Sequence, residues 1–111
     1  MTYLQRSACL AEMAAYQDRD AFVSDLSLSS LWGDPEESAE IPDERIAALA
    51  RLWEVVHCSM RELLAPMTPT QASRRFCIPV RTLEDWYAGR RVCPVYVRLL
   101  LAESLEHAAD L

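Results

Sequence analysis

Proline and glycine divide the second half of the chain into short segments. Thr68-Pro69 is typical of a helix start, because threonine caps the first turn and proline fits its first position. Three further breaks follow at Pro79, Gly89 and Pro94. Glycine is placed to end a helix in the left-handed region, and proline permits a new helix to begin. We therefore predict three short helices, and the apolar residues expected to pack the last one are Val95, Leu99, Leu100 and Leu105.

A single apolar stripe precedes these segments. Its members recur every three or four residues, the period of an α-helix, at Ile46, Leu49, Trp53, Val56, Met60 and Leu63. Asp43 is placed to cap the start of this stripe. Ser59 and Glu62 form an S-x-x-E capping box inside it. We predict two helices here, with a break near His57 or Cys58.

The N-terminal half predicts two further helices and an acidic loop. The first helix should end near Gln17, and the second should lie within residues 20–28. The apolar face of the first helix is expected to hold Leu4, Ala8, Ala11 and Ala15. Residues 29–42 contain glycine, two prolines and four acids, which favours a solvated loop. Within it we expect Trp32 to anchor the chain on the core, and an exposed partner contact is the alternative.

Composition favours helices over sheets. The 111 residues include only two glycines, and 51% are apolar. A chain of this size is expected to bury one core. We predict an all-α helical bundle in which residues 1–57 form an acidic helical extension packed on the core. Residues 58–111 hold the short helices, and the two parts are expected to make one compact unit.

The chain carries no sign of export or membrane insertion. No apolar run approaches the ~18 residues of a membrane span, so a cytoplasmic protein that does not bind a membrane is expected. Four cysteines without a C-x-x-C pair predict buried, reduced thiols. The alternative, a zinc site, lacks the usual short ligand spacing and would use His57, Cys58, Cys77 and Cys93. No cofactor is expected.

Charge is unevenly distributed along the chain. The net charge is −6, yet residues 67–100 hold six arginines and two acids, while the remainder holds five arginines and 15 acids. Such asymmetry indicates that one region meets an anion. A solvated acidic face is the simplest interpretation of the N-terminal half.

Residues 68–94, TPTQASRRFCIPVRTLEDWYAGRRVCP, resemble the Xre/Cro-type helix-turn-helix domains of bacterial and phage regulators. The resemblance extends over about residues 59–105. It implies a five-helix bundle whose third helix enters the major groove of DNA, with residues 58–111 as the helix-turn-helix domain. Ser73 would let two helices cross closely. The family usually has glycine where this chain has Cys77, so either a left-handed backbone there costs roughly 1 kcal/mol or the turn differs slightly from the family's.

The resemblance also assigns site residues. In the family's docking geometry, residues near the start of the third helix read bases, which here are Val80, Arg81 and Glu84. Val80 could contact a thymine methyl, Arg81 could bind guanine, and Glu84 could accept from cytosine N4. Phosphate contacts are expected from Thr68, Thr70, Gln71, Arg74, Arg75, Arg90 and Arg91.

The remaining side chains of the third helix are also assigned to faces. Those expected to face the core are Thr82, Leu83 and Trp86, and those expected outward include Asp85, Tyr87 and Ala88. An alternative role for Asp85 or Glu84 is a surface ion pair with Arg81 or another nearby arginine.

Two functions follow from these features. The first is a sequence-specific regulator of transcription, a repressor or autoregulator, that binds double-stranded DNA. It would gain affinity as a homodimer on two half-sites, with the stripe from Ile46 to Val56 as a candidate interface. The alternative is a protein-interaction module, such as an antitoxin or a phage-encoded anti-CRISPR inhibitor, whose acidic residues 1–57 occupy a partner's basic groove. An enzyme is not expected, because no nucleophile with a base, paired carboxylates or glycine-rich phosphate loop occurs.

Overall fold

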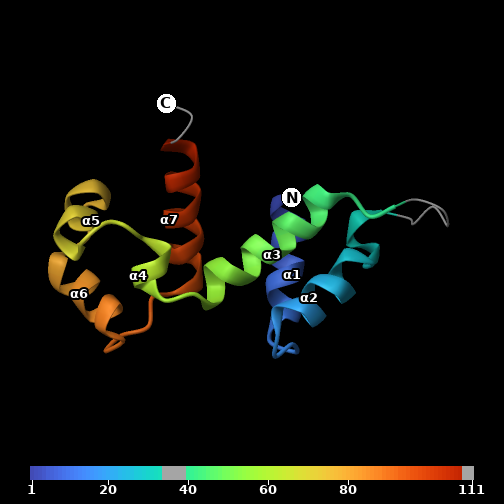
Figure 1. Ribbon diagram of the computed structural model, residues 1–111, viewed down its shortest axis with the longest axis horizontal. Coiled ribbons are helices and arrows are strands. Elements are labelled where there is room, and N and C mark those ends of the chain that lie inside the picture. Colours follow the sequence, from blue (N-terminus) through green and yellow to red (C-terminus); the bar gives the residue numbers. More distant parts are fainter. Residues whose placement is uncertain (34–39, 109–111) are drawn as a thin grey trace. The chain divides into compact units, whose positions relative to one another are not determined.

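The computed structural model describes residues 1–33 and 40–108, and within these ranges it contains helices and no strand (Figure 1). The helices are α1 (Tyr3–Met13), α2 (Arg19–Ser27), the 3-10 turn η1 (Ser30–Trp32), α3 (Asp43–His57), α4 (Met60–Leu63), α5 (Pro69–Phe76), α6 (Val80–Ala88) and α7 (Val95–Ala108). The predicted all-α class is confirmed. The chain divides into two compact units, Met1–Glu54 and Val55–Leu111, so the boundary falls inside α3. The packing of residues 1–57 on the rest stays a prediction.

Helix starts follow local capping. A side-chain oxygen accepts a backbone N–H of the first turn at Thr2, Asp18, Ser29, Ser59 and Thr68. Each such bond satisfies a donor that has no partner inside its helix. Because these signals are local, the sequence predicted most of the helix starts in the second half of the chain.

The predicted break in the long apolar stripe is present. Helix α3 ends at His57, and the Ser59 hydroxyl oxygen then accepts from the Glu62 N–H at 3.1 Å. The carbonyls at the end of α3 gain a charged donor, because Arg98 Nη1 of α7 donates to Val55 O at 3.2 Å and to Cys58 O at 2.6 Å. Arg98 thus ties the start of α7 to the end of α3 inside the second unit.

The stripe itself is mainly core. Leu49 is fully buried, Trp53 and Val56 are half-buried, and Ile46 is 39% exposed. Burial leaves little of this face for a second copy, and the homodimer stays a prediction.

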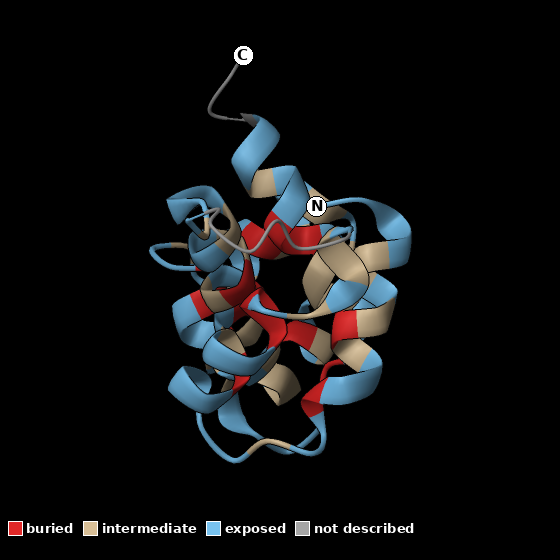
Figure 2. Cartoon of the chain, turned by 90° about the vertical axis from the view of Figure 1, so that its right-hand side faces the viewer, coloured by how far each residue is buried: buried red, intermediate tan, exposed pale blue. Residues whose placement is uncertain are grey.

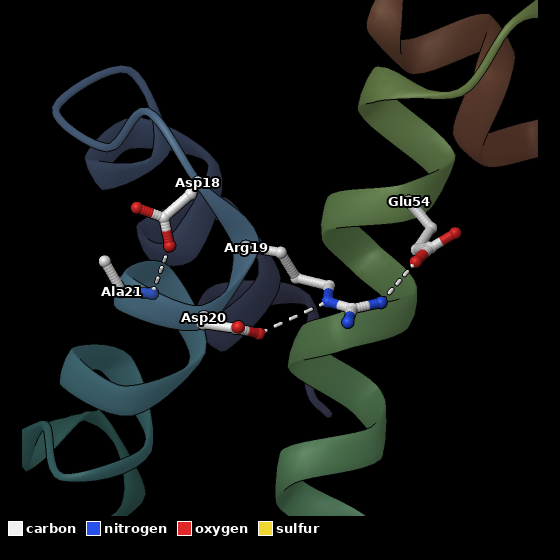
Figure 3. A network of polar contacts seen from close by, with 5 residues as sticks. All are labelled: Asp18, Arg19, Asp20, Ala21 and Glu54. Atoms are coloured by element: carbon white, nitrogen blue, oxygen red, sulfur yellow. Dashed lines mark hydrogen bonds and ion pairs between the residues drawn. The ribbon is translucent and has the colours of Figure 1, made fainter.

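The first unit has a small aromatic core. Its buried apolar residues are Cys9, Met13, Phe22, Leu26, Leu49 and Leu52. The Phe22 ring lies 5.7 Å from the Tyr16 ring and 5.4 Å from the Trp53 ring, measured between centroids. At the surface, Arg19 at the start of α2 reaches α3, where Nη1 lies 2.7 Å from Glu54 Oε1 (Figure 3).

The predicted apolar face of α1 is wrong at Leu4, Ala11 and Ala15, while Ala8 is half-buried. Leu4 is 78% exposed, and Ala11 and Ala15 are also exposed, whereas Cys9 and Met13 are buried. The Gln5 amide Nε2 near the start of α1 donates to Leu31 O of η1 at 3.2 Å, a contact between residues far apart in the sequence. Alanines give little apolar area, so larger side chains on the other face decide which side is buried.

Trp32 is an anchor, as predicted. Its Nε1 donates to Leu26 O at 2.8 Å, and the Arg45 guanidinium carbon lies 4.7 Å from the ring centroid. The predicted solvated loop falls largely on residues 34–39, which lie outside the described residues.

The second unit is built on one buried cluster. Its members come from the end of α3 and from α4 to α7, namely Val55, Met60, Leu63, Leu64, Ala72, Leu83, Cys93, Leu101 and Ala102. In the cartoon coloured by burial, buried, intermediate and exposed residues alternate along the helices (Figure 2).

The predicted core face of α7 needs correction. Val95 is 40% exposed and Leu100 is 61% exposed, while Leu101 and Ala102 are buried. Arg98, Leu101, Ala102 and Leu105 are spaced by three, four and seven residues and therefore share one face. The bonds from Arg98 to the end of α3 hold that face inward.

Candidate nucleic-acid interface

Helices α5 and α6 are joined by a closed, left-handed turn. Cys77 ends α5 with φ 56° and ψ 36°, and its N–H donates to Ser73 O at 2.9 Å. The Ser73 hydroxyl donates to Ile78 O at 2.6 Å, across the turn. Cys77 therefore adopts a left-handed backbone, which glycine adopts more readily than other residues. Ser73 contributes a hydrogen bond as well as the small size that the sequence indicated.

Helix α6 is anchored along its inner side. Leu83 is fully buried, Thr82 is half-buried, and Trp86 packs against the core cluster. Tyr87 was expected to point outward, and this is wrong. Its ring packs on the same cluster, its hydroxyl donates to Met67 O at 2.8 Å, and burial raises its pKa.

The three base-reading candidates lie on the exposed side of the first turns of α6. Val80 is 38% exposed, and Arg81 and Glu84 are also exposed. Within the part of the chain that the structure describes, neither Arg81 nor Glu84 forms an ion pair. The structure thus brings these side chains together on one accessible helix surface. The alternative that Glu84 is held by an arginine is not observed there.

The start of α5 presents a backbone donor. Thr68 Oγ1 accepts from the Gln71 N–H at 3.2 Å, and Gln71 Oε1 accepts from the Thr68 N–H at 2.9 Å. Since Pro69 has no N–H, the Thr70 N–H is the first-turn donor that this capping box leaves over. Gln71 therefore helps to shape the helix start and keeps its amide N–H groups for other partners. The T-x-x-Q spacing is the sequence signal that could have shown this role.

Two arginines lie near the other end of α5. Arg74 and Arg75 are exposed in its last turn, where positive charge is favourable beside the helix C-terminus. The Arg75 guanidinium carbon lies 5.5 Å from the Phe76 ring centroid. Both keep hydrogen-bond donors that face solvent.

Arg90 and Arg91 are held by Asp85. Arg90 Nε donates to Asp85 Oδ1 at 2.9 Å, and Arg91 Nε lies 3.6 Å from Asp85 Oδ2. Gly89 at φ 77° turns the chain back, so that the Arg90 and Arg91 N–H groups donate to Asp85 O at 2.9 and 3.3 Å. This backbone pattern is a Schellman-type helix end.

Asp85 is more enclosed than its partners. Its side chain is 15% exposed, against 64% for Arg90 and 68% for Arg91. The hydrogen bond from Arg90, with the charges of Arg90, Arg91 and Arg81, holds the pKa of Asp85 below its usual value, although burial acts in the opposite direction. An arginine partner for Asp85 was predicted and is confirmed. Arg90 and Arg91 come after the end of α6, and they reach Asp85 because the chain turns back at Gly89. The spacing of these residues in the sequence does not predict this turn.

The six arginines of residues 67–100 are therefore not all free to bind a further partner. Arg98 is bound to the end of α3, Arg90 and Arg91 share Asp85, and the arginines without such partners are Arg74, Arg75 and Arg81. Among residues 1–33 and 40–108 no three potential metal ligands gather, so the four-residue zinc alternative is not assembled. None of the described helices is long and apolar enough to cross a membrane.

The surface formed by α5, the turn and α6 combines helix-start donors, exposed arginines and the exposed first turns of α6. The chain was compared with protein-family models, curated protein sequences and solved structures, and no family model, sequence or structure showed significant similarity to it.

Proposed function

We propose that this chain is a sequence-specific DNA-binding protein that regulates transcription, with α6 in the major groove. The observation that carries the proposal is the exposed row Val80, Arg81 and Glu84 on the first turns of a helix that Leu83 anchors from below. A helix of this kind, joined to its predecessor by a short turn, fits the width of the major groove.

Each residue of the row has a chemical role in the proposal. Arg81 can donate two parallel hydrogen bonds to guanine O6 and N7, while Glu84 accepts from the amino group of cytosine. Val80 provides an apolar contact for a thymine methyl. None of these roles needs a rearrangement of the fold, because all three side chains are exposed.

The phosphate contacts would position α6. The Thr70 N–H and the Gln71 amide lie at the positive end of α5, and Arg74 and Arg75 lie at its other end. Arg90 and Arg91 follow α6 and extend the basic surface. Such contacts fix the orientation of a protein on DNA and carry no sequence information themselves.

The test is binding to duplex DNA measured by fluorescence anisotropy at several salt concentrations. We expect the wild type to bind a duplex from upstream of its own gene, with affinity that falls steeply as salt rises. Arg81→Ala should lose about 1–3 kcal/mol of discrimination at one base pair. Arg6→Ala, on α1, removes the same charge far from α6 in the sequence and should leave that discrimination unchanged.

The result that would overturn the proposal is equally direct. If the wild type binds neither the upstream duplex nor a random duplex at low salt, DNA binding is wrong. If Arg81→Ala and Arg6→Ala give the same base preference as the wild type, α6 does not read sequence.

A second candidate rests on the charge of the first unit. Residues 1–54 hold eleven acids and four arginines, and among these arginines Arg19 pairs with Glu54 and Arg45 lies over the Trp32 ring. Such a surface suits a partner with a basic groove. A wild type that binds no DNA, but forms a stable complex with a basic nucleic-acid-binding protein through residues 1–57, would favour this function.

A further inference from the structure

The contacts of Asp85 raise a question that the proposed function does not answer. A carboxylate beside the DNA-facing surface repels phosphate, yet Asp85, a residue of α6 itself, lies against two arginines assigned to phosphate. From charge alone, an uncharged residue at this position would bind DNA better. The geometry around Asp85 indicates a different role.

Asp85 holds Arg90 and Arg91 by the same atom of each guanidinium. It is the Nε of Arg90, at 2.9 Å, and the Nε of Arg91, at 3.6 Å, that approach the two carboxylate oxygens. A guanidinium has five N–H donors, so the terminal Nη groups of both side chains keep theirs. The Arg90 side chain is 64% exposed and the Arg91 side chain is 68% exposed, so these donors remain accessible to solvent.

The main chain adds a second constraint on the same two residues. The Arg90 and Arg91 N–H groups both donate to the carbonyl oxygen of Asp85, so one residue contacts the backbone and the side chain of each arginine. Long side chains lose rotamer freedom when they bind, and a side chain already held in place loses less.

We propose that Asp85 is a positioning residue that holds Arg90 and Arg91 in place, so that their terminal guanidinium nitrogens bind the DNA phosphates flanking α6. This inference rests on the proposed DNA binding. It assigns a favourable role to an acidic residue that would otherwise weaken binding. Asp85 itself contacts no nucleotide in this arrangement.

The experiment compares two variants in which an uncharged residue replaces Asp85. Asp85→Asn removes the negative charge and keeps an oxygen that can accept from Arg90 Nε, whereas Asp85→Ala removes both. We expect Asp85→Asn to bind a random duplex about three- to tenfold more tightly than Asp85→Ala, because only the alanine variant must order both arginines on binding. The slope of log affinity against log salt should also be shallower for Asp85→Ala, by about one phosphate contact.

Two controls separate positioning from other effects. In a background carrying Arg90→Ala and Arg91→Ala, the difference between the asparagine and alanine variants should disappear. The matched pair Glu103→Gln and Glu103→Ala on α7 should show no difference in either background. Circular dichroism of each variant checks that it is folded, and a loss of folded protein would lower the bound fraction without changing the salt slope.

The outcomes distinguish this inference from the proposed function. If the wild type binds no duplex, both are wrong. If the wild type binds and the asparagine and alanine variants bind equally, or if their difference persists without the two arginines, the role of Asp85 is wrong and DNA binding stands.

Discussion

At the scale of single residues, Cys77 shows how the chain keeps a turn without the usual glycine. Its φ of 56° is the one positive value among the described residues other than glycine. The side chain is exposed, so the strain is local to the backbone. Ser73 compensates in part, because its hydroxyl bonds Ile78 O on the far side of the turn.

Replacing Cys77 with glycine should stabilise the fold. Relief of the left-handed strain should stabilise the folded state by about 1–2 kcal/mol. The greater freedom of glycine in the unfolded chain should destabilise it by about 0.4–1 kcal/mol. We therefore expect the free energy of unfolding to rise by about 0.5–1 kcal/mol. Urea unfolding followed by circular dichroism measures it.

Gly89 offers the matched opposite change. A Cβ built at this position meets no atom within 4 Å, so Gly89→Ala adds backbone strain and no clash at φ 77°. We expect it to cost about 1 kcal/mol. Equal stability of Cys77→Gly and the wild type, together with a neutral Gly89→Ala, would contradict the account of both turns.

At the scale of elements, Arg98 links two helices that are far apart in the sequence. Its half-buried guanidinium donates to Val55 O and Cys58 O, which lie at and just beyond the last turn of α3. The Val55 carbonyl belongs to the last turn of α3, where helix carbonyls have no partner within the helix. The same contact sets which face of α7 is buried, as the exposure of Val95 and Leu100 shows.

Arg98→Met should therefore destabilise the second unit. The methionine keeps an unbranched apolar side chain and leaves the two carbonyls without their charged donor, which should cost about 1–3 kcal/mol. The measurement is the free energy of unfolding in urea. Arg74→Met, at an exposed position of α5, should stay within about 0.5 kcal/mol of the wild type. Equal effects of the two variants would show that the Arg98 contacts contribute nothing measurable.

At the scale of the whole molecule, each compact unit encloses a buried thiol. Cys9 is 0% exposed in the first unit and Cys93 is 2% exposed in the second, and burial raises the pKa of both thiols. Cys77 is exposed in the turn between α5 and α6, and the prediction that the cysteines are buried is wrong for it. Cys58 is half-buried.

Thiol labelling should report on these environments. The reactive form is the thiolate, and a raised pKa lowers its fraction at neutral pH, so Cys9 and Cys93 should react only when their units open. Cys77 should react first. Mass spectrometry of peptides after timed treatment with an aromatic disulfide reagent identifies each site, and Cys77→Ser should abolish the fast phase. Fast labelling of Cys9 or Cys93 in the native protein would contradict the burial.

The sequence by itself determined the helical class and most of the helix boundaries in the second half. Helix caps such as Ser59 and Thr68, and helix-ending residues such as Gly89, start or end a helix through contacts with residues nearby in the sequence. These helix boundaries can therefore be predicted from short stretches of sequence. The exposed positions of Val80, Arg81 and Glu84 also follow from local helical spacing once Leu83 faces the core.

Only the tertiary structure decided which helix faces are buried and which charged side chains are paired. Gln5 of α1 contacts Leu31, and Arg98 of α7 contacts the end of α3, and both partners are remote in the sequence. The turn after α6 likewise brings Arg90 and Arg91 back to Asp85. Sequence spacing counts arginines but does not show their partners, because a hydrogen bond depends on distance in space and direction.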